Sequence, residues 1–103
     1  MLRSSDAPTA LFTSQNLITL EALRALHHLG LQAQVALVGF DDVPLGEAIE
    51  PAVTVVAQSA RELGRQAAQL LFSRLDGYDG PARRLILDTP LIQRGSGELP
   101  PRR

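Results

Sequence analysis

One apolar run near the middle of the chain restricts the possible folds more than any other stretch. The run does not alternate with polar residues, and an aromatic residue and two carboxylates close it: Val35-Ala36-Leu37-Val38-Gly39-Phe40-Asp41-Asp42. An unbroken apolar run predicts a strand that is covered on both faces, as in the parallel sheets of α/β proteins. Ligands bind such sheets beyond the carboxyl ends of the strands. The sequence therefore predicts a ligand site close to Asp41 and Asp42.

The residues before this run predict a strand–helix–strand unit. Positions 9–13 have the β-branched and aromatic content of a short strand. Asn16 is a suitable N-cap for the helix that follows, and Gly30 is placed to end it in the left-handed conformation. The apolar residues of this helix fit one face: Ile18, Ala22, Ala25, Leu26 and Leu29. The unit has the length of a βαβ motif, so the predicted fold class is α/β with a parallel sheet.

A second helix is expected after a third strand at positions 53–56. Ser59 and Glu62 match a capping box, which predicts that the helix begins there and ends near Gly77. Gly64 lies inside this helix, where glycine costs about 1 kcal/mol relative to alanine. We therefore expect a close packing contact at Gly64.

The end of the chain is expected to contain two more strands and a tail. Positions 84–87 are apolar enough for a fourth strand, and positions 90–92 for a short last one. From Gly95 onwards the sequence is polar and predicts a frayed tail.

Composition excludes several classes of function. The net charge is −1, so the chain has no electrostatic footprint for nucleic acid. Cysteine is absent, which removes disulfides and thiolate metal sites. No apolar run approaches the roughly 18 residues of a membrane helix. The adjacent His27 and His28 face directions about 100° apart on a helix, so no metal site is expected. Because no nucleophile–base set, phosphate loop or dinucleotide-binding glycine pattern is present, we expect neither an enzyme nor a cofactor.

The chain resembles the C-terminal part of the lactose-repressor/galactose-repressor (LacI/GalR) family of transcription regulators. Four motifs carry the resemblance, in the family's order and close to its spacing. They are Pro8-Thr9-Ala10-Leu11-Phe12 with Gln15-Asn16, Val38-Gly39-Phe40-Asp41-Asp42, Pro51-Ala52-Val53-Thr54-Val55 with Gln58 and Leu63-Gly64, and Leu91-Ile92-Gln93-Arg94-Gly95-Ser96. Together they cover the chain from Pro8 to Ser96.

The resemblance implies a periplasmic-binding-protein-like type I fold, in which two α/β subdomains enclose a small effector. It assigns positions 1–8 to a lead-in and 9–57 to the end of the C-terminal effector-binding subdomain. Positions 58–90 then cross back to the N-terminal subdomain, and positions 91–103 form the last strand and a flexible tail. It also implies that a helix-turn-helix headpiece and the first half of the core lie upstream, so that this chain is a fragment of a cytoplasmic protein.

The resemblance also selects three effector-binding residues. Asp41 stands at the family's effector-contact position, and its carboxylate suits sugar hydroxyls because charged acceptors form stronger hydrogen bonds. From the pattern alone, a turn-starting or capping aspartate is an equal alternative. Gln58 and Gln15 stand at two further site positions, where an amide offers both donor and acceptor. Gln15 replaces the family's usual asparagine, and a solvated loop residue is the alternative for Gln58. Asp42 is expected to act as a structural cap.

A dimer interface is the last feature that the resemblance implies. Leu17, Leu20, Ala48 and Ile49 match the positions through which family members form homodimers. Core burial beneath the missing subdomain is the alternative interpretation of these residues.

The sequence thus predicts the effector-sensing and dimerising part of a repressor that binds a small molecule, most simply a sugar. The effector controls operator DNA through the upstream headpiece, and no membrane is involved. A fragment of a periplasmic sugar-binding transport protein has the same architecture and stays open as an alternative. An upstream helix-turn-helix or an upstream signal peptide would separate the two.

Overall fold

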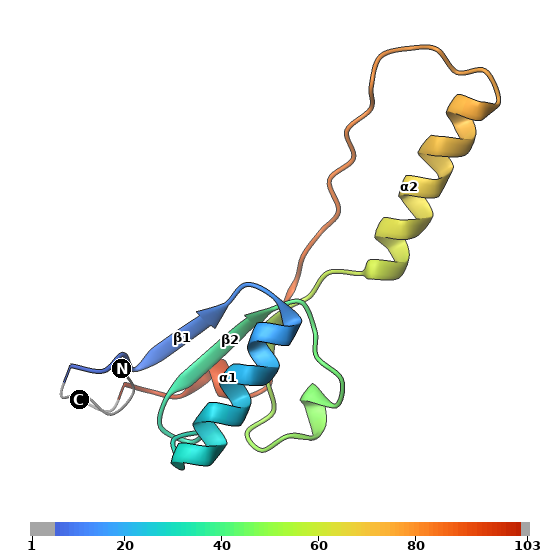
Figure 1. Ribbon diagram of the computed structural model, residues 1–103. Helices are drawn as coiled ribbons and strands as arrows, with labels where there is room; N and C mark the ends of the chain where they lie inside the picture. Colours follow the sequence, from blue (N-terminus) through green and yellow to red (C-terminus); the bar gives the residue numbers. More distant parts are fainter. Residues whose placement is uncertain (1–5, 102–103) are drawn as a thin grey trace. The chain divides into compact units, whose positions relative to one another are not determined.

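The computed structural model describes residues 6–101, which fall into two compact units. The described residues of the first unit are positions 6–57 and 90–101, and the second unit comprises positions 58–89. Figure 1 shows the helices and strands along the chain. In chain order they are β1 (Ala10–Thr13), α1 (Asn16–Leu29), β2 (Ala36–Phe40), the 3-10 turn η1 (Gly46–Ala48), β3 (Thr54–Val56), α2 (Ala60–Leu75), β4 (Leu91–Ile92) and the 3-10 turn η2 (Ser96–Glu98).

The first unit is built on a four-stranded sheet in the order β1-β2-β3-β4. The first three strands are parallel, so the predicted α/β class and the βαβ unit are confirmed. β4 pairs with β3 in the antiparallel direction, unlike the all-parallel sheet expected. The cause lies in the chain path, because the Ala57 N–H, just after β3, bonds the Pro90 carbonyl, just before β4, at 2.9 Å. The chain therefore returns at the end of β3 from which it left.

The core of this unit lies between α1 and one face of the sheet. It consists of Leu23, Leu26, Val35, Leu37, Val43, Val53 and Val55. The face that α1 buries is Thr19, Leu23 and Leu26, so the predicted face is only partly right, with Ile18 49% exposed. The hydroxyls of Thr13 and Thr19 share a buried hydrogen bond of 2.6 Å, and this contact rotates the helix toward its threonine. The polar residue Thr19 therefore belongs to the buried face of α1, and a pattern of apolar residues does not predict this.

Gly39 allows α1 to approach β2 at this point. A Cβ at Gly39 would lie 2.8 Å from the Thr19 Oγ1, closer than side chains pack. At Gly64, by contrast, an added Cβ would meet nothing within 4 Å among the described residues, so the packing contact expected there is not found.

These two glycines form a matched test of the helix–sheet contact. We expect Gly39→Ala to lower the free energy of unfolding by about 1–3 kcal/mol, because the helix must shift to admit the methyl group. Gly64→Ala is expected to raise it by about 0.5–1 kcal/mol, because alanine is the better helix former. Urea denaturation of both variants measures the two effects, and equal effects of the two substitutions would contradict this packing.

The opposite face of the sheet is covered only in part. Figure 1 shows α1 on one side of the strands and η2 on the other. Gly97 of η2 lies so close to Val38 and Thr54 that a Cβ there would be 2.8–2.9 Å from their side chains. Phe12 on β1 is 62% exposed on this face. The cover on both faces that was expected of the apolar run at 35–42 is therefore found at the centre of β2, whereas β1, for which it was not expected, is covered on one face only.

The segment after β4 is an integral part of this unit. Ser96 is buried, its hydroxyl donates to the Leu37 carbonyl at 2.6 Å, and it accepts the Thr54 N–H at 2.9 Å. The Ser96 N–H donates to the Ala52 carbonyl at 3.0 Å. The frayed tail expected from Gly95 is therefore wrong for positions 95–98. Small and polar residues there satisfy backbone groups of the sheet instead of standing in solvent.

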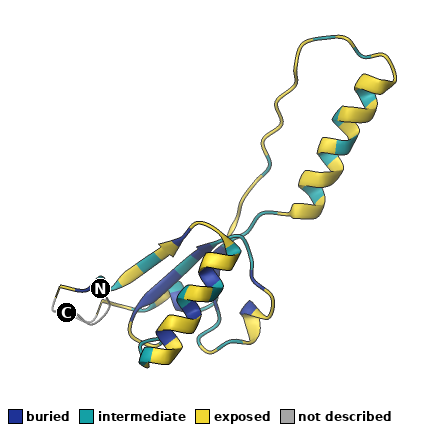
Figure 2. Cartoon of the chain, in the orientation of Figure 1, coloured by how far each residue is buried: buried dark blue, intermediate teal, exposed yellow. Residues whose placement is uncertain are grey.

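The second unit contains α2 and the segment that follows it. The helix begins as predicted, because the Ser59 Oγ accepts the Glu62 N–H at 3.1 Å. The Glu62 carboxylate binds Arg65 and Gln66, and these bonds lower its pKa to about 2. Figure 2 shows that no residue of α2 is buried. None of the helices within positions 6–101 is both long and apolar enough to cross a membrane.

The strand expected at positions 84–87 is not formed. Leu85 and Ile86 are 53% and 80% exposed, and the segment has no ladder partner within the described part of the chain. A strand requires a neighbour to satisfy its backbone groups, so an apolar run alone does not produce one.

Candidate functional site

The carboxyl ends of β1 and β2 bring two of the predicted site residues to one edge of the sheet. Thr13 at the end of β1 pairs with Gly39 in β2. Gln15 and Asp41 each follow this pair by two residues, just beyond the ends of these two parallel strands. Their backbones therefore lie at the edge where parallel sheets bind ligands.

Asp41 holds an unusual backbone conformation at this edge. Its φ is +76°, in the left-handed region that few residues other than glycine adopt. Its N–H donates to the Val56 carbonyl at 2.7 Å, and its Oδ1 accepts the Asp42 N–H at 2.9 Å. The residue is half-buried. Such conformations persist where the surroundings fix them, and they concentrate at ligand sites.

Asp42 forms an ion pair with Arg94 that the sequence did not reveal. Two parallel bonds of 2.9 Å join the Arg94 Nη1 and Nη2 to the Asp42 Oδ1 and Oδ2. The Asp42 Oδ1 also accepts the Val43 N–H at 2.8 Å, which fits the structural role expected of Asp42. The hydrogen bonds from Arg94 lower the pKa of Asp42, although its partial burial opposes this shift. The same pair raises the pKa of Arg94.

This pair predicts a loss of stability in acid. Because the pKa of Asp42 in the folded chain is below its ordinary value of 3.8, the unfolded chain takes up the proton first as the pH falls. The contribution of the pair is complete above the ordinary pKa and is lost as the pH falls through the lowered one. The Asp42 side chain is 42% exposed, so we expect only about 1 kcal/mol at neutral pH.

Urea unfolding of the parent protein and of Arg94→Gln between about pH 7 and pH 3 measures this contribution. The difference in unfolding free energy between the two is expected to shrink toward the acid end. A difference that stays constant across this range would contradict the assignment to Asp42.

The two glutamines of the predicted site lie at the starts of the helices. Gln15 is the N-cap residue of α1, so Asn16 is the first helical residue and the N-cap expected at Asn16 is wrong. The side chain of Gln15 is exposed, and its carbonyl accepts the Thr19 N–H at 2.9 Å. Gln58 follows β3 by two residues, is half-buried, and begins the second unit. The structure therefore brings Gln15 and Asp41 together at one edge of the first unit.

The four residues predicted for a dimer interface differ in exposure. Leu17 is 65% exposed, and Ala48 is exposed as well. Leu20 and Ile49 are half-buried and pack against the core of the first unit. Only the first two therefore present most of their side-chain surface to solvent.

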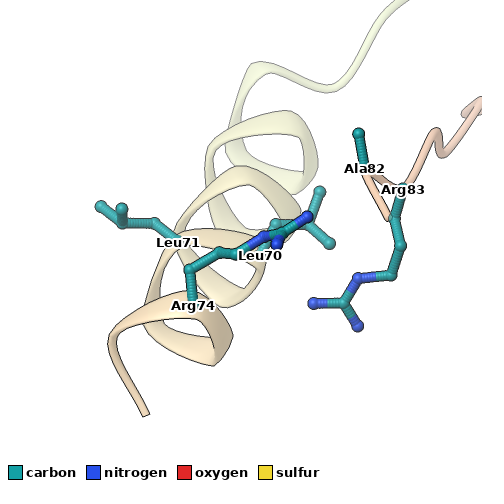
Figure 3. A pocket seen from close by; sticks show the side chains of 5 residues that line it. All are labelled: Leu70, Leu71, Arg74, Ala82 and Arg83. Atoms are coloured by element: carbon teal, nitrogen blue, oxygen red, sulfur yellow. The ribbon is translucent and has the colours of Figure 1, made fainter. Parts of the chain in front are cut away.

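Two hollows lie in the second unit, between α2 and the segment after it. Figure 3 shows the first, a space of about 260 Å³ with Leu70, Leu71 and Arg74 on the helix and Ala82 and Arg83 on the facing segment. The guanidinium carbons of Arg74 and Arg83 lie 4.8 and 4.1 Å from the centre of the Tyr78 ring. The second hollow, of about 330 Å³, extends along the apolar side of α2. None of the predicted site residues lines either hollow.

The described residues contain no group of three or more side chains placed to hold a metal ion. His27 and His28 are exposed in the last turn of α1.

The comparison with known families decides to which one the chain belongs. A family model described as a periplasmic binding protein-like domain matches residues 1–97. The chain belongs to this family. The periplasmic-binding-protein-like fold expected from the four sequence motifs is thereby confirmed.

The relatives that this chain matches are named as transcriptional regulators. The HTH-type transcriptional regulator PtxS of Pseudomonas plecoglossicida is 41% identical over 90% of this chain and 28% of its own length. The structure of a CelR–cellobiose complex is 40% identical, with a TM-score of 0.76, over 86% of this chain and 28% of that one. A LacI family regulator from Arthrobacter sp. FB24 in complex with lactose is 30% identical, with a TM-score of 0.76, over 94% and 37%. The resemblance to LacI/GalR regulators is therefore confirmed, and the chain spans between 28% and 37% of the length of these proteins.

Proposed function

We propose that this chain forms part of the effector-binding core of a cytoplasmic LacI-family repressor, and that its effector is a sugar. The observation that carries the proposal is Asp41, held with a φ of +76° at the carboxyl end of β2. Two structural neighbours of this chain are complexes, one with cellobiose and one with lactose, which supports a sugar as the ligand class.

In this proposal the three polar residues divide the recognition of sugar hydroxyls. The Asp41 carboxylate accepts hydrogen bonds from hydroxyl groups, and the charge strengthens those bonds. The amides of Gln15 and Gln58 each supply a donor and an acceptor, so they suit hydroxyls that act in both senses. Positions 9–57 then belong to the C-terminal effector-binding subdomain, and positions 58–90 cross to the N-terminal one.

The effector acts on DNA by linkage. A sugar that binds one arrangement of the two subdomains better than another shifts the population toward that arrangement. The shift changes how a helix-turn-helix headpiece engages operator DNA, by the free energy that couples the two sites. A homodimer formed through the surface that includes Leu17 and Ala48 presents two headpieces to one operator.

A thermal-shift panel tests the sugar proposal on the protein that carries this chain. Cellobiose, lactose and a set of monosaccharides are compared with a polyol and with an amino-acid mixture. A ligand that binds the folded state raises the melting temperature in proportion to the logarithm of its concentration above Kd. We expect at least one sugar to do so. Stabilisation by an amino acid and by none of the sugars would count against the proposed ligand class.

A further inference from the structure

We propose that Arg94 is a positioning residue that holds the Asp41 carboxylate in place through Asp42. The inference rests on the proposed function where it concerns ligand affinity, and on geometry alone where it concerns the Asp41 carboxylate. In sequence, Arg94 lies 52 residues from Asp42 and 40 residues from Thr54. It nevertheless contacts both residues, which stand at the two ends of the loop after β2.

The guanidinium fixes Asp42 in direction as well as in distance. Both nitrogens of the planar fork bond both oxygens of the Asp42 carboxylate at 2.9 Å, a geometry that a single charged contact does not impose. The Arg94 Nη1 also donates to the Val53 carbonyl at 3.3 Å, and its backbone N–H donates to the Thr54 Oγ1 at 3.1 Å. Its side chain is only 17% exposed. Arg94 is therefore anchored to Val53 and Thr54, at the start of β3, while it holds Asp42.

Asp42 passes this constraint on to Asp41. The Asp42 N–H donates to the Asp41 Oδ1 at 2.9 Å, so a fixed Asp42 backbone fixes one oxygen of the Asp41 carboxylate. The Asp41 N–H is bound to the Val56 carbonyl on β3. An aspartate at a φ of +76° requires such support because the conformation is unfavourable without it.

Gly46 is a second, independent sign that the pair is built into the loop. A Cβ at this position would lie 3.2 Å from the Arg94 Nη1 and 3.3 Å from the Asp42 Oδ1. It would also lie 2.9 Å from the Val43 Cγ2. The loop therefore packs closely over the Asp42–Arg94 ion pair at position 46. A side chain at this position would displace Arg94 or Asp42, whereas glycine leaves both in place.

The first arm of the test needs no ligand. Amide hydrogen exchange is measured in the protein that carries this chain and in its Arg94→Gln variant. We expect protection of the Asp42 N–H to fall at least about tenfold, because its acceptor is no longer held. The Thr54 N–H, bound to the Ser96 Oγ, is expected to keep its protection, which would show that η2 stays docked. Unchanged exchange at Asp42 would overturn the proposal.

The second arm measures sugar affinity by calorimetry, with cellobiose and lactose as probes. Arg94→Gln and Asp42→Asn are each expected to weaken sugar binding about tenfold. The double variant is expected to bind no more weakly than the single variant with the larger loss, because the two residues act as a unit. Arg94→Lys, which keeps the charge and loses the fork, is expected to recover part of the affinity. The control Arg24→Gln removes an exposed arginine of α1, 79% accessible, and is expected to change nothing.

The outcomes of the two arms are distinct. Faster exchange at Asp42 with unchanged sugar affinity would overturn the role of Arg94 in binding. Additive losses in the double variant would overturn the coupling through Asp42. If the parent protein bound neither sugar, those two effectors would be excluded, and the exchange at Asp42 would still decide whether Arg94 holds the loop.

Discussion

Replacing Asp41 by asparagine is expected to weaken sugar binding about 100-fold while the protein stays folded. Asparagine is among the few residues that tolerate the left-handed conformation, so the φ of +76° is preserved and the charge alone is removed. A hydrogen bond to a charged group contributes about 1.5–3 kcal/mol, which corresponds to one to two powers of ten in affinity. Calorimetric titration with the best sugar of the panel measures the change.

Two further variants separate the roles of charge and conformation. Asp41→Ala removes the carboxylate and also strains the backbone, so it is expected to lose sugar binding entirely and some stability as well. Asp79→Asn removes the charge of an exposed aspartate in the second unit and is expected to leave affinity unchanged. An affinity of Asp41→Asn equal to that of the parent would remove Asp41 from the site.

The second large effect is expected at Thr54, where valine should lower the free energy of unfolding by about 3 kcal/mol. Thr54 is fully buried, and its hydroxyl makes every bond it can. It donates to the Glu98 carboxylate at 3.0 Å and accepts the N–H groups of Arg94 and Gly97, both at 3.1 Å. Valine has the same shape, so the loss measures unsatisfied polar groups and not a cavity.

Denaturant unfolding of Thr54→Val tests this expectation, with Thr54→Ser as the variant that keeps the hydroxyl. Thr89→Val, at an exposed position of the second unit, is the matched control and should alter stability by less than about 0.5 kcal/mol. A loss at Thr54 no greater than at Thr89 would mean that the segment 93–98 does not depend on this hydroxyl.

Both helices and the strands of the sheet were predictable because local patterns encode them, whereas the apolar run at 84–87 predicted a strand that is not formed. The unbroken apolar run gives β2, Gly30 ends α1 with a φ of +71°, and Ser59 starts α2. Each of these signals acts within a few residues of the element it defines. The position of Asp41 followed from a similar rule, since the end of a central parallel strand is where ligands bind.

The remaining features depend on contacts between distant parts of the chain. The Ser96 hydroxyl donates a hydrogen bond to the carbonyl of Leu37, which lies 59 residues away in the sequence. No periodicity of the sequence predicts a hydrogen bond between residues so far apart. The motif containing Arg94 was recognised, yet no role was predicted for its arginine because its partner Asp42 lies 52 residues away in the sequence. The buried face of α1 was misplaced for a related reason, since a threonine pair and Gly39 set its rotation. The positive φ of Asp41 has no signature in the sequence.

A crystal structure of the protein that carries this chain, with its best sugar bound, tests the central claim most directly. We expect the sugar at the carboxyl ends of β1 and β2, with a hydroxyl within about 3 Å of the Asp41 carboxylate. We also expect that Arg94 keeps both bonds to Asp42 in that complex. A sugar bound elsewhere, with the Asp41 carboxylate in contact with water alone, would contradict this claim.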